Sequence, residues 1–271
     1  ENVSTGVDVY STRQPLGVVG IISPFNFPLI LSIRSVAPAL ALGNAVVLKP
    51  DPRTPITGGH VIARVFEEAG LPKGLLQVIP GAADVGIAVV EAPDVRVVSF
   101  TGSTAAGRKV GELASANLKR VHLELGGKNS IIVLPGADVA KAASAAAFGS
   151  FLHQGQICMS TGRIVVHESL YDDFVEILRG KAQNLPVGNP HTEQVALGPV
   201  IDHKQLERMD AIVKATVSAG ATLTAGGTHH SSFSFSITTE MMEDYAEILD
   251  VEMLIIDKNT NIRQFKQDIR N

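Results

Sequence analysis

The chain has 271 residues, of which 45% are hydrophobic and 18% are charged, with a net charge of −4 and a single cysteine. This composition is typical of a soluble globular protein with one large core or two domains. The negative charge, without a Lys/Arg cluster, argues against nucleic-acid binding, and no apolar run is long enough to span a membrane. One cysteine excludes an internal disulfide framework and a multi-cysteine zinc site, so we expect a cytoplasmic protein without a metal.

The first 16 residues form a separate segment in this interpretation. They contain the alternating run Val7–Tyr10, which predicts a strand with one polar and one apolar face. A single strand is unstable by itself, so we expect it to pair with another element, such as one from a second subunit. A homo-oligomer is therefore expected.

Strands and helices alternate from residue 17 to residue 126. Short apolar runs predict strands over residues 17–22, 45–48, 75–79, 95–100 and 121–125. The segments between them have helical patterns, over residues 29–42, 57–69, 84–91 and 104–116. Such alternation is typical of βαβ units and predicts an α/β fold with a mostly parallel sheet, whose sites follow the carboxyl ends of the strands.

The composition changes at Gly126-Gly127, where we place the boundary between two domains, 17–126 and 127–228. In the second domain we expect strands over residues 129–134 and 163–167, helices capped by Asp138 and Ser169, and a helix over residues 202–219. From residue 229 to 271 the charge rises and alanine becomes rare. Here we expect a helix through Met241, Tyr245, Ile248 and Leu249, a strand over residues 251–256 and no functional site.

Cys158, the only cysteine, lies in the segment Gln154–Ser160. A thiolate is a strong nucleophile toward a carbonyl carbon, and Gly155 lets the backbone come close to a molecule bound over the sulfur. Alternatively, a lone cysteine is a small buried hydrophobic residue. His153 nearby would suit a Cys-His hydrolase, but no Asn or Asp that would orient the imidazole is identifiable. We therefore interpret it as a helix-surface or pocket-wall histidine.

Oxidation of an aldehyde would use several residues of the chain together. The thiolate of Cys158 would attack the aldehyde, and the side chain of Asn26 and the backbone N–H of Cys158 would donate hydrogen bonds to the oxyanion. After hydride has left to a nicotinamide ring, Glu124 would activate the water that hydrolyses the thioester. Each residue also has a structural interpretation: Asn26 as a turn residue, Glu124 as a solvated carboxylate and Lys49 as a surface lysine.

Five motifs occur in the order seen in aldehyde dehydrogenases, which the chain resembles from about Gly6 to Gly227. The motifs are Pro24-Phe25-Asn26-Phe27-Pro28, Lys49-Pro50, Phe100-Thr101-Gly102-Ser103-Thr104 through Gly107, Glu124-Leu125-Gly126-Gly127-Lys128 and Gly155-Gln156-Ile157-Cys158. The resemblance implies Cys158 as nucleophile, Glu124 as general base and Asn26 as oxyanion donor. It also implies a small-molecule aldehyde as substrate.

The resemblance further implies a site for NAD or NADP. Lys49 is implied near the ribose and Ser103 near the pyrophosphate, where the N-terminus of the next helix favours an anion. The remaining implied cofactor residues are Ser23, Pro24, Phe25, Gly102 and Gly107. The two glycines do not form the G-x-G-x-x-G fingerprint of an ordinary Rossmann dehydrogenase, and they could simply start and pack a helix.

Two departures from the family pattern matter. Pro52 takes the place at which many NAD-preferring members carry a glutamate, so we expect NADP to be accepted with NAD, and Lys49 to pair with the extra phosphate. Second, the Phe-Gly-Pro motif that holds the nicotinamide ribose is absent, and residues 229–271 do not resemble the family. The alternative is therefore a partial, catalytically silent protein that binds nucleotides or assembles. Lys49-Pro50-Asp51-Pro52 is reminiscent of benzaldehyde and vanillin dehydrogenases, for which Phe27 and Phe151 could line an aromatic pocket.

Overall fold

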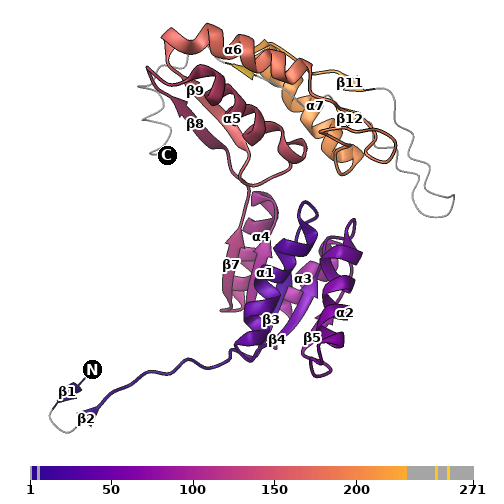
Figure 1. The fold of residues 1–271 in the computed structure, drawn as a ribbon. Helices are drawn as coiled ribbons and strands as arrows, with labels where there is room; N and C mark the ends of the chain where they lie inside the picture. Colours follow the sequence, from indigo (N-terminus) through magenta and orange to yellow (C-terminus); the bar gives the residue numbers. More distant parts are fainter. Residues whose placement is uncertain (1, 5–6, 231–247, 250–254, 257–271) are drawn as a thin grey trace. The chain divides into compact units, whose positions relative to one another are not determined.

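The computed structural model describes residues 2–4, 7–230, 248–249 and 255–256 (Figure 1). The chain divides into two compact units, Glu1–Gly126 and Gly127–Asn271, which are described separately. The division falls between the two glycines at which the composition of the sequence changes.

A five-stranded sheet forms the centre of the first unit, with the strand order β5-β4-β3-β6-β7. Its strands, all parallel, are β3 (Val18–Ile22), β4 (Ala45–Lys49), β5 (Leu76–Val78), β6 (Val95–Thr101) and β7 (Arg120–Glu124). Within this sheet, the chain first forms the central strand β3 and then β4 and β5 on one side of it. It then crosses to the other side of β3 and forms β6 and β7. Ligands of such sheets bind where the two halves meet, beyond the carboxyl ends of the central strands. The predicted α/β fold with a parallel sheet is confirmed.

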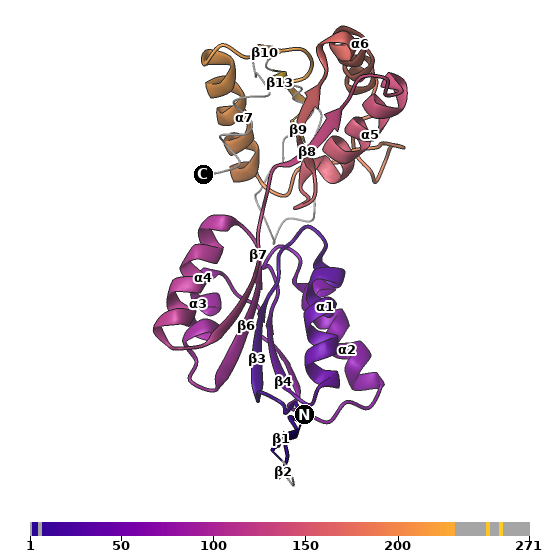
Figure 2. The same cartoon turned by 90° about the vertical axis from the view of Figure 1, so that its left-hand side faces the viewer.

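Helices cover both faces of this sheet (Figure 2). On one face lie α1 (Pro28–Ala41) and α2 (Val61–Glu68), and on the other lie α3 (Ala83–Glu91) and α4 (Thr104–Ala116). On the central strand, Ile21 packs in a core with Val36 of α1, whereas Ile22 packs in a second core with Val110 of α4. Burial on both faces explains why β3 and most of β4 are continuous apolar runs instead of alternating sequences.

The helix predicted over residues 57–69 starts differently from expectation. A π-helical segment, η1 (Ile56–His60), precedes α2. Gly58 and Gly59 are buried in η1, and a Cβ atom at Gly59 would lie 2.7 Å from Cγ1 of Val78. The wide turn thus brings Gly59 against Val78 of β5 and Gly58 against Pro28 and Pro50, a packing requirement that helical periodicity does not reveal.

The segment before the sheet contains two short antiparallel strands, β1 (Asn2–Ser4) and β2 (Val7–Asp8). The predicted strand Val7–Tyr10 is therefore shorter than expected, and its partner belongs to the same chain. From Asp8 to Gly17 every residue is exposed, Tyr10 to 86%.

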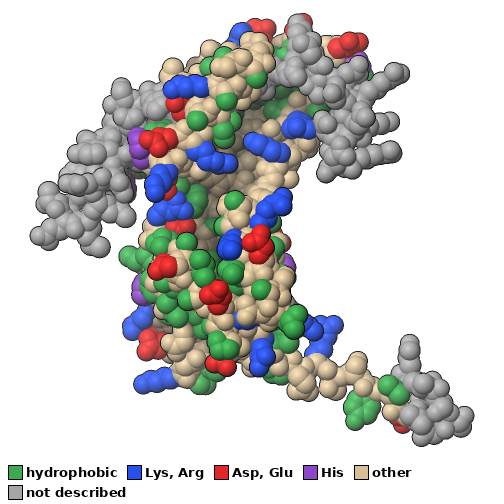
Figure 3. Space-filling view, turned by 180° about the vertical axis from the view of Figure 1, so that it is seen from behind, with side chains coloured by type: hydrophobic (Ala, Val, Ile, Leu, Met, Phe, Trp, Pro, Cys, Tyr) green, Lys and Arg blue, Asp and Glu red, His purple; other side chains and the backbone are tan. Residues whose placement is uncertain are grey.

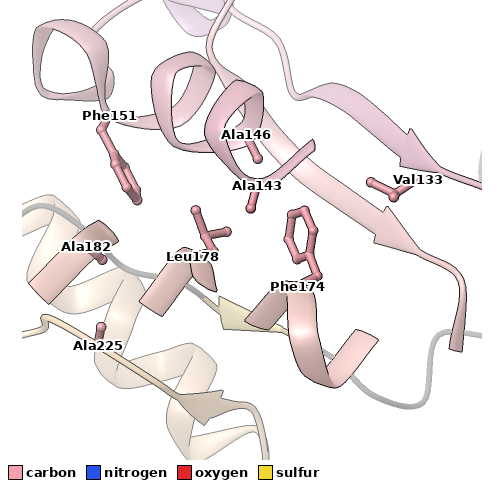
Figure 4. Packing of buried hydrophobic residues seen from close by; sticks show 8 residues of the cluster. All are labelled: Val133, Ala143, Ala146, Phe151, Phe174, Leu178, Ala182 and Ala225. Atoms are coloured by element: carbon pink, nitrogen blue, oxygen red, sulfur yellow. The ribbon is translucent and has the colours of Figure 1, made fainter. Parts of the chain in front are cut away.

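The second unit is built around two parallel strands, β8 (Asn129–Val133) and β9 (Thr161–Val166). The helices α5 (Val139–Phe151) and α6 (Glu168–Gln183) pack together with these strands around one core (Figure 4). The buried residues of this core are Val133, Ala143, Ala146, Phe151, Phe174, Leu178, Ala182 and Ala225. A 3-10 turn, η2 (Leu152–Gly155), follows α5, and α7 (His203–Ser218) follows a long loop. Four two-residue strands form the pairs β10 (Thr222–Leu223) with β13 (Ile255–Ile256) and β11 (His229–His230) with β12 (Ile248–Leu249).

Two details of the second unit correct the sequence predictions. The cap of α6 is His167, whose Nδ1 accepts a hydrogen bond from the N–H of Ser169 at 3.3 Å, so Ser169 is not the cap. The helix predicted through Met241, Tyr245, Ile248 and Leu249 is wrong at the last two residues, which pair as a strand with β11. Met241 and Tyr245 lie outside the described residues. A short apolar run is compatible with both the helical and the strand period, and here the pairing with β11 favours the strand. Of the strand predicted over residues 251–256, only Ile255–Ile256 lies within the described residues.

Candidate active site

The predicted residues of the first unit gather at the carboxyl edge of the sheet. Ser23 follows β3 and donates its N–H to the carbonyl of Lys49, the last residue of β4, at 3.1 Å. On the other half, the N–H of Gly102 donates to the carbonyl of Glu124, the last residue of β7, at 3.0 Å. Since β3 and β6 are hydrogen-bonded neighbours, these groups border the point where the two halves of the sheet meet.

The turn between β3 and α1 carries Pro24, Phe25 and Asn26. The hydroxyl of Ser23 is buried and lies 2.6 Å from the hydroxyl of Ser32 on α1, which ties the start of the turn to the helix. Pro28 occupies the first position of α1, where a missing N–H costs nothing. The turn therefore holds partly buried Asn26 between a fixed strand end and a fixed helix start.

Lys49 is buried, with 6% of its surface exposed. Its Nζ donates to the carbonyl of Pro50 at 3.0 Å. Burial lowers the pKa of Lys49, and the guanidinium of Arg53 acts in the same direction, while Asp51 and Asp84 oppose the shift. The interpretation of Lys49 as an ordinary surface lysine is wrong.

The N-terminus of α4 has the features of an anion site. Ser103 is its N-cap and accepts a hydrogen bond from the N–H of Ala106 at 3.3 Å. A Cβ atom at Gly102 would lie 2.6 Å from the ring of Phe100, and one at Gly107 would overlap Leu125, so both glycines permit close packing around this helix start. The exposed N–H groups of a first turn and the helix dipole suit a pyrophosphate. Together with Lys49 at the end of β4, these residues fit a dinucleotide.

Glu124 has two basic neighbours that the sequence does not reveal. Its carboxylate lies 4.0 Å from Nη2 of Arg34 and 3.5 Å from Nε2 of His122, and 46% of its side chain is exposed. Arg34 also donates to the hydroxyl of Thr101 at 2.8 Å, so it links α1 to the ends of β6 and β7. Arg34 and Glu124 lie far apart in the sequence, and no spacing rule connects them.

Cys158 lies in the second unit, exposed, in the loop between η2 and β9. The approach to it is conformationally unusual, because His153, Gln154 and Gly155 have φ values of 56°, 55° and 64°. This region suits glycine, and for other residues each left-handed conformation costs on the order of 1 kcal/mol. His153 therefore lies in a strained turn and not on the surface of helix α5. A lone buried hydrophobic cysteine is excluded by the exposure of Cys158.

Hydrogen bonds within the second unit hold the loop of Cys158. Asn129, the first residue of β8, donates its side-chain amide to the carbonyls of Cys158 at 3.0 Å and Ser160 at 3.1 Å. The side chain of Gln156 accepts a hydrogen bond from the N–H of Ile201 at 3.0 Å. The sequence analysis did not identify Asn129 as a residue of the site, although it directly follows the Glu124–Lys128 motif.

Phe151 does not line an open aromatic pocket. It is 8% exposed and belongs to the core of the second unit with Leu178 and Phe174 (Figure 4). Its side chain is thus required for packing between α5 and α6. Phe27 is partly buried at the start of α1.

Within the described part of the chain, no helix has the length and apolar character needed to cross a membrane. The same residues contain no group of three or more His, Cys, Asp or Glu side chains that could hold a metal ion.

The family of the chain follows from comparison with known proteins. The model of the aldehyde dehydrogenase family matches residues 1–247. The chain belongs to the aldehyde dehydrogenase family. The match extends beyond Gly227, where the motif resemblance ends, and includes the part of the tail up to residue 247.

Among curated proteins, the chain is similar to a vanillin dehydrogenase of Amycolatopsis sp., with 66% identity over 82% of the chain and 46% of that protein. It is also similar to the benzaldehyde dehydrogenase [NAD(+)] of Pseudomonas putida, with 53% identity over 82% of the chain and 45% of that protein. The chain thus spans less than half the length of these relatives.

The chain is also similar to solved structures of aldehyde dehydrogenases. An NAD-dependent benzaldehyde dehydrogenase from Corynebacterium glutamicum matches with a TM-score of 0.74 and 49% identity, over 79% of the chain and 47% of that structure. A Mycobacterium tuberculosis aldehyde dehydrogenase complexed with NAD+ matches with a TM-score of 0.79 and 40% identity, over 82% of the chain and 46% of that structure.

Proposed function

We propose that the chain carries the nucleophile and cofactor site of an enzyme that oxidises an aromatic aldehyde to a carboxylic acid with NAD or NADP. The observation that carries the proposal is the conjunction of family membership with an exposed Cys158 in its matching motif. Relatives named for benzaldehyde and vanillin support an aromatic substrate. Partly buried Phe27, in the turn that also holds Asn26, is the candidate for contact with the ring.

In this proposal, the chemistry proceeds through a covalent bond between Cys158 and the substrate. The thiolate adds to the aldehyde carbon, and the side chain of Asn26 and the backbone N–H of Cys158 donate hydrogen bonds to the oxyanion. A nicotinamide cofactor bound at the assigned site would supply the acceptor for the hydride that leaves this carbon. Glu124 then takes a proton from water, which attacks the thioester, releases the acid and restores the thiol.

The cofactor is assigned to the carboxyl edge of the sheet in the first unit. We assign the ribose to Lys49 and the pyrophosphate to Ser103 at the start of α4. The remaining assigned residues are Ser23, Pro24, Phe25, Gly102 and Gly107. The hydrogen bonds that tie Ser23 to Lys49 and Gly102 to Glu124 support a preformed edge.

A second candidate function is a catalytically silent protein that binds nucleotides or assembles with other copies. We also propose self-association, since residues of the N-terminal segment and of several helices expose large apolar side chains.

A single experiment separates the two functions. The chain is mixed with benzaldehyde and NAD or NADP, while reduced cofactor is followed by absorbance and acyl-enzyme by intact-protein mass spectrometry. An active enzyme turns over, Cys158→Ala shows neither signal, and Glu124→Gln gives one burst and stalls as the acyl-enzyme. General-base assistance is typically worth about 10²–10⁴-fold. Turnover by Cys158→Ala contradicts the assigned nucleophile, and a wild-type chain without either signal favours the silent protein.

A further inference from the structure

The π-helical segment η1 has a wide turn that contains two consecutive buried glycines. The N–H of Val61 donates to the carbonyl of Ile56, five residues earlier, which is the hydrogen bond of a π-helix. Gly58 and Gly59 are buried inside this turn. Single π-helical turns are rare and occur frequently at functional sites. The contacts of the first glycine connect η1 to the candidate site.

Gly58 lies directly against the start of α1. A Cβ atom at this position would lie 3.2 Å from Cβ of Pro28, 3.3 Å from Cβ of Pro50 and 3.6 Å from the carbonyl oxygen of Pro28. The first two distances are shorter than an ordinary contact between carbon atoms, so an added methyl group would press on both prolines. Pro28 is the first residue of α1 and follows Asn26, the candidate oxyanion donor, by two positions. The place of Pro28 thus depends on the absence of a side chain at Gly58.

The turn between β3 and α1 has little freedom to absorb a shift of Pro28. Pro24 and Pro28 fix their own φ angles and restrict the residues before them. At the beginning of the turn, the backbone N–H of Ser23 donates to the carbonyl of Lys49 at 3.1 Å, which ties the turn to the end of β4. A displacement of Pro28 would therefore fall on the residues between Ser23 and Pro28, which include Asn26.

We propose that Gly58 is a positioning residue for Asn26, because it leaves free the space that the start of α1 occupies. The inference rests on the proposed function, in which Asn26 donates a hydrogen bond to the oxyanion. Such a donor stabilises the reaction only when it points at the position that the oxyanion takes, and the loss of one donor typically costs about 10²–10³-fold in rate. A small displacement of Asn26 should cost less, about tenfold.

Gly59 provides a matched control at the next position. The three atoms nearest to a Cβ atom there would be Cγ1 of Val78 at 2.7 Å and two ring carbons of Pro50 at 3.0 and 3.6 Å. The clash is more severe than at Gly58, but it is directed at β5 and Pro50 instead of at the start of α1. Gly59→Ala should therefore lower the denaturation midpoint more than Gly58→Ala and slow the reaction less. A merely structural role would give the same order in both measurements.

The first turnover of the full chain tests the inference. Benzaldehyde and saturating NAD are mixed rapidly with each variant, NADH is followed by absorbance and the acyl-enzyme by quenched-flow mass spectrometry. Gly58→Ala should slow acyl-enzyme formation about tenfold, whereas Gly59→Ala should slow it less. Gly111→Ala, in α4, should leave the rate unchanged, because its Cβ would only make an ordinary contact of 3.6 Å with Leu123.

A double-mutant cycle shows whether the effect passes through Asn26. In an Asn26→Ala background, Gly58→Ala should slow acyl-enzyme formation little further, because the donor that it positions is already absent. Pro28→Ala is a second variant that adds no atom to the buried space and replaces Gly58→Ala if that chain does not fold. It frees the turn, so it should slow the reaction only when Asn26 is present.

The outcomes separate this inference from the proposed function. An equal loss of rate with and without Asn26, or a Gly59→Ala chain that is slower than Gly58→Ala, overturns the inference while the proposed function stands. If the wild-type chain forms no acyl-enzyme, the proposed function fails and the inference fails with it.

Discussion

At the scale of single residues, the loop of Cys158 depends on side chains that the motif does not contain. Three consecutive left-handed residues bring the chain from α5 to the cysteine, and Asn129 holds two carbonyls on the far side of it. Strain of this kind persists only where surrounding contacts determine the backbone. Asn129 is therefore a positioning residue for the nucleophile in our proposal.

We predict that Asn129→Ala loosens this loop. The loss of two hydrogen bonds should lower the free energy of unfolding by about 1–2 kcal/mol. The rate of alkylation of Cys158 by iodoacetamide at constant pH should rise, because the loop loses a restraint. With one thiol in the chain, this rate reports on Cys158 alone. Ser130→Ala, at the next position of β8, is the control, and equal alkylation rates in all three proteins contradict the prediction.

At the scale of elements, helix caps are local sequence features whose contribution to the free energy of unfolding can be measured. Asp138 caps α5, and its Oδ1 accepts a hydrogen bond from the N–H of Lys141 at 3.1 Å. The helix is rich in alanine and supplies three buried residues to the core of the second unit, so its start affects that whole core.

Asp138→Ala is expected to lower the free energy of unfolding by about 1 kcal/mol, because the first turn of α5 loses its cap. Asp138→Asn keeps an oxygen acceptor at the same place and should lose much less. Chemical denaturation followed by circular dichroism measures both. A loss that is equal for the two variants would mean that the charge near Lys141, and not the cap, is the stabilising feature.

Apart from η1, the strands and helices from β3 to β7 could be predicted from the sequence to within a residue or two, because apolar strand segments alternate there with helical patterns. The strand β1 was not predicted. The π-helical η1 could not be predicted, since the packing of Gly59 against Val78 exists only in the folded unit. Motif positions supply the candidate site residues, but not their partners. The contacts of Arg34 with Glu124 and of Asn129 with Cys158 join distant parts of the sequence, so no spacing rule predicts them.

At the scale of the whole molecule, the surface contains many large apolar side chains. On the face drawn in Figure 3, hydrophobic side chains reach the surface between charged ones. On β8 and just beyond it, Ile132 is 56% exposed and Leu134 is 64% exposed, and on α5 Phe148 is 68% exposed. Because large exposed apolar surfaces usually mark contact sites, we expect that this surface contacts further protein.

The chain as given should therefore self-associate as its concentration rises. Light scattering after size exclusion should give a mass above the 28.6 kDa of one chain. Replacing Ile132 and Phe148 with Thr should shift the distribution toward the monomer, whereas Ser130→Ala should not. A monomer at every concentration, with full aldehyde dehydrogenase activity, would show that no further protein is needed.

The position of β3 at the centre of the sheet also has a consequence during synthesis on the ribosome. β3 precedes the other four strands of its sheet in the chain, yet both of its edges are covered in the folded unit. Its second edge pairs with β6, and Val95 follows Val18 by roughly 77 residues, which take roughly 4–15 s to translate at 5–20 residues per second. For that interval the nascent chain carries an apolar strand with one open edge, which makes β3 the segment that a chaperone would protect first.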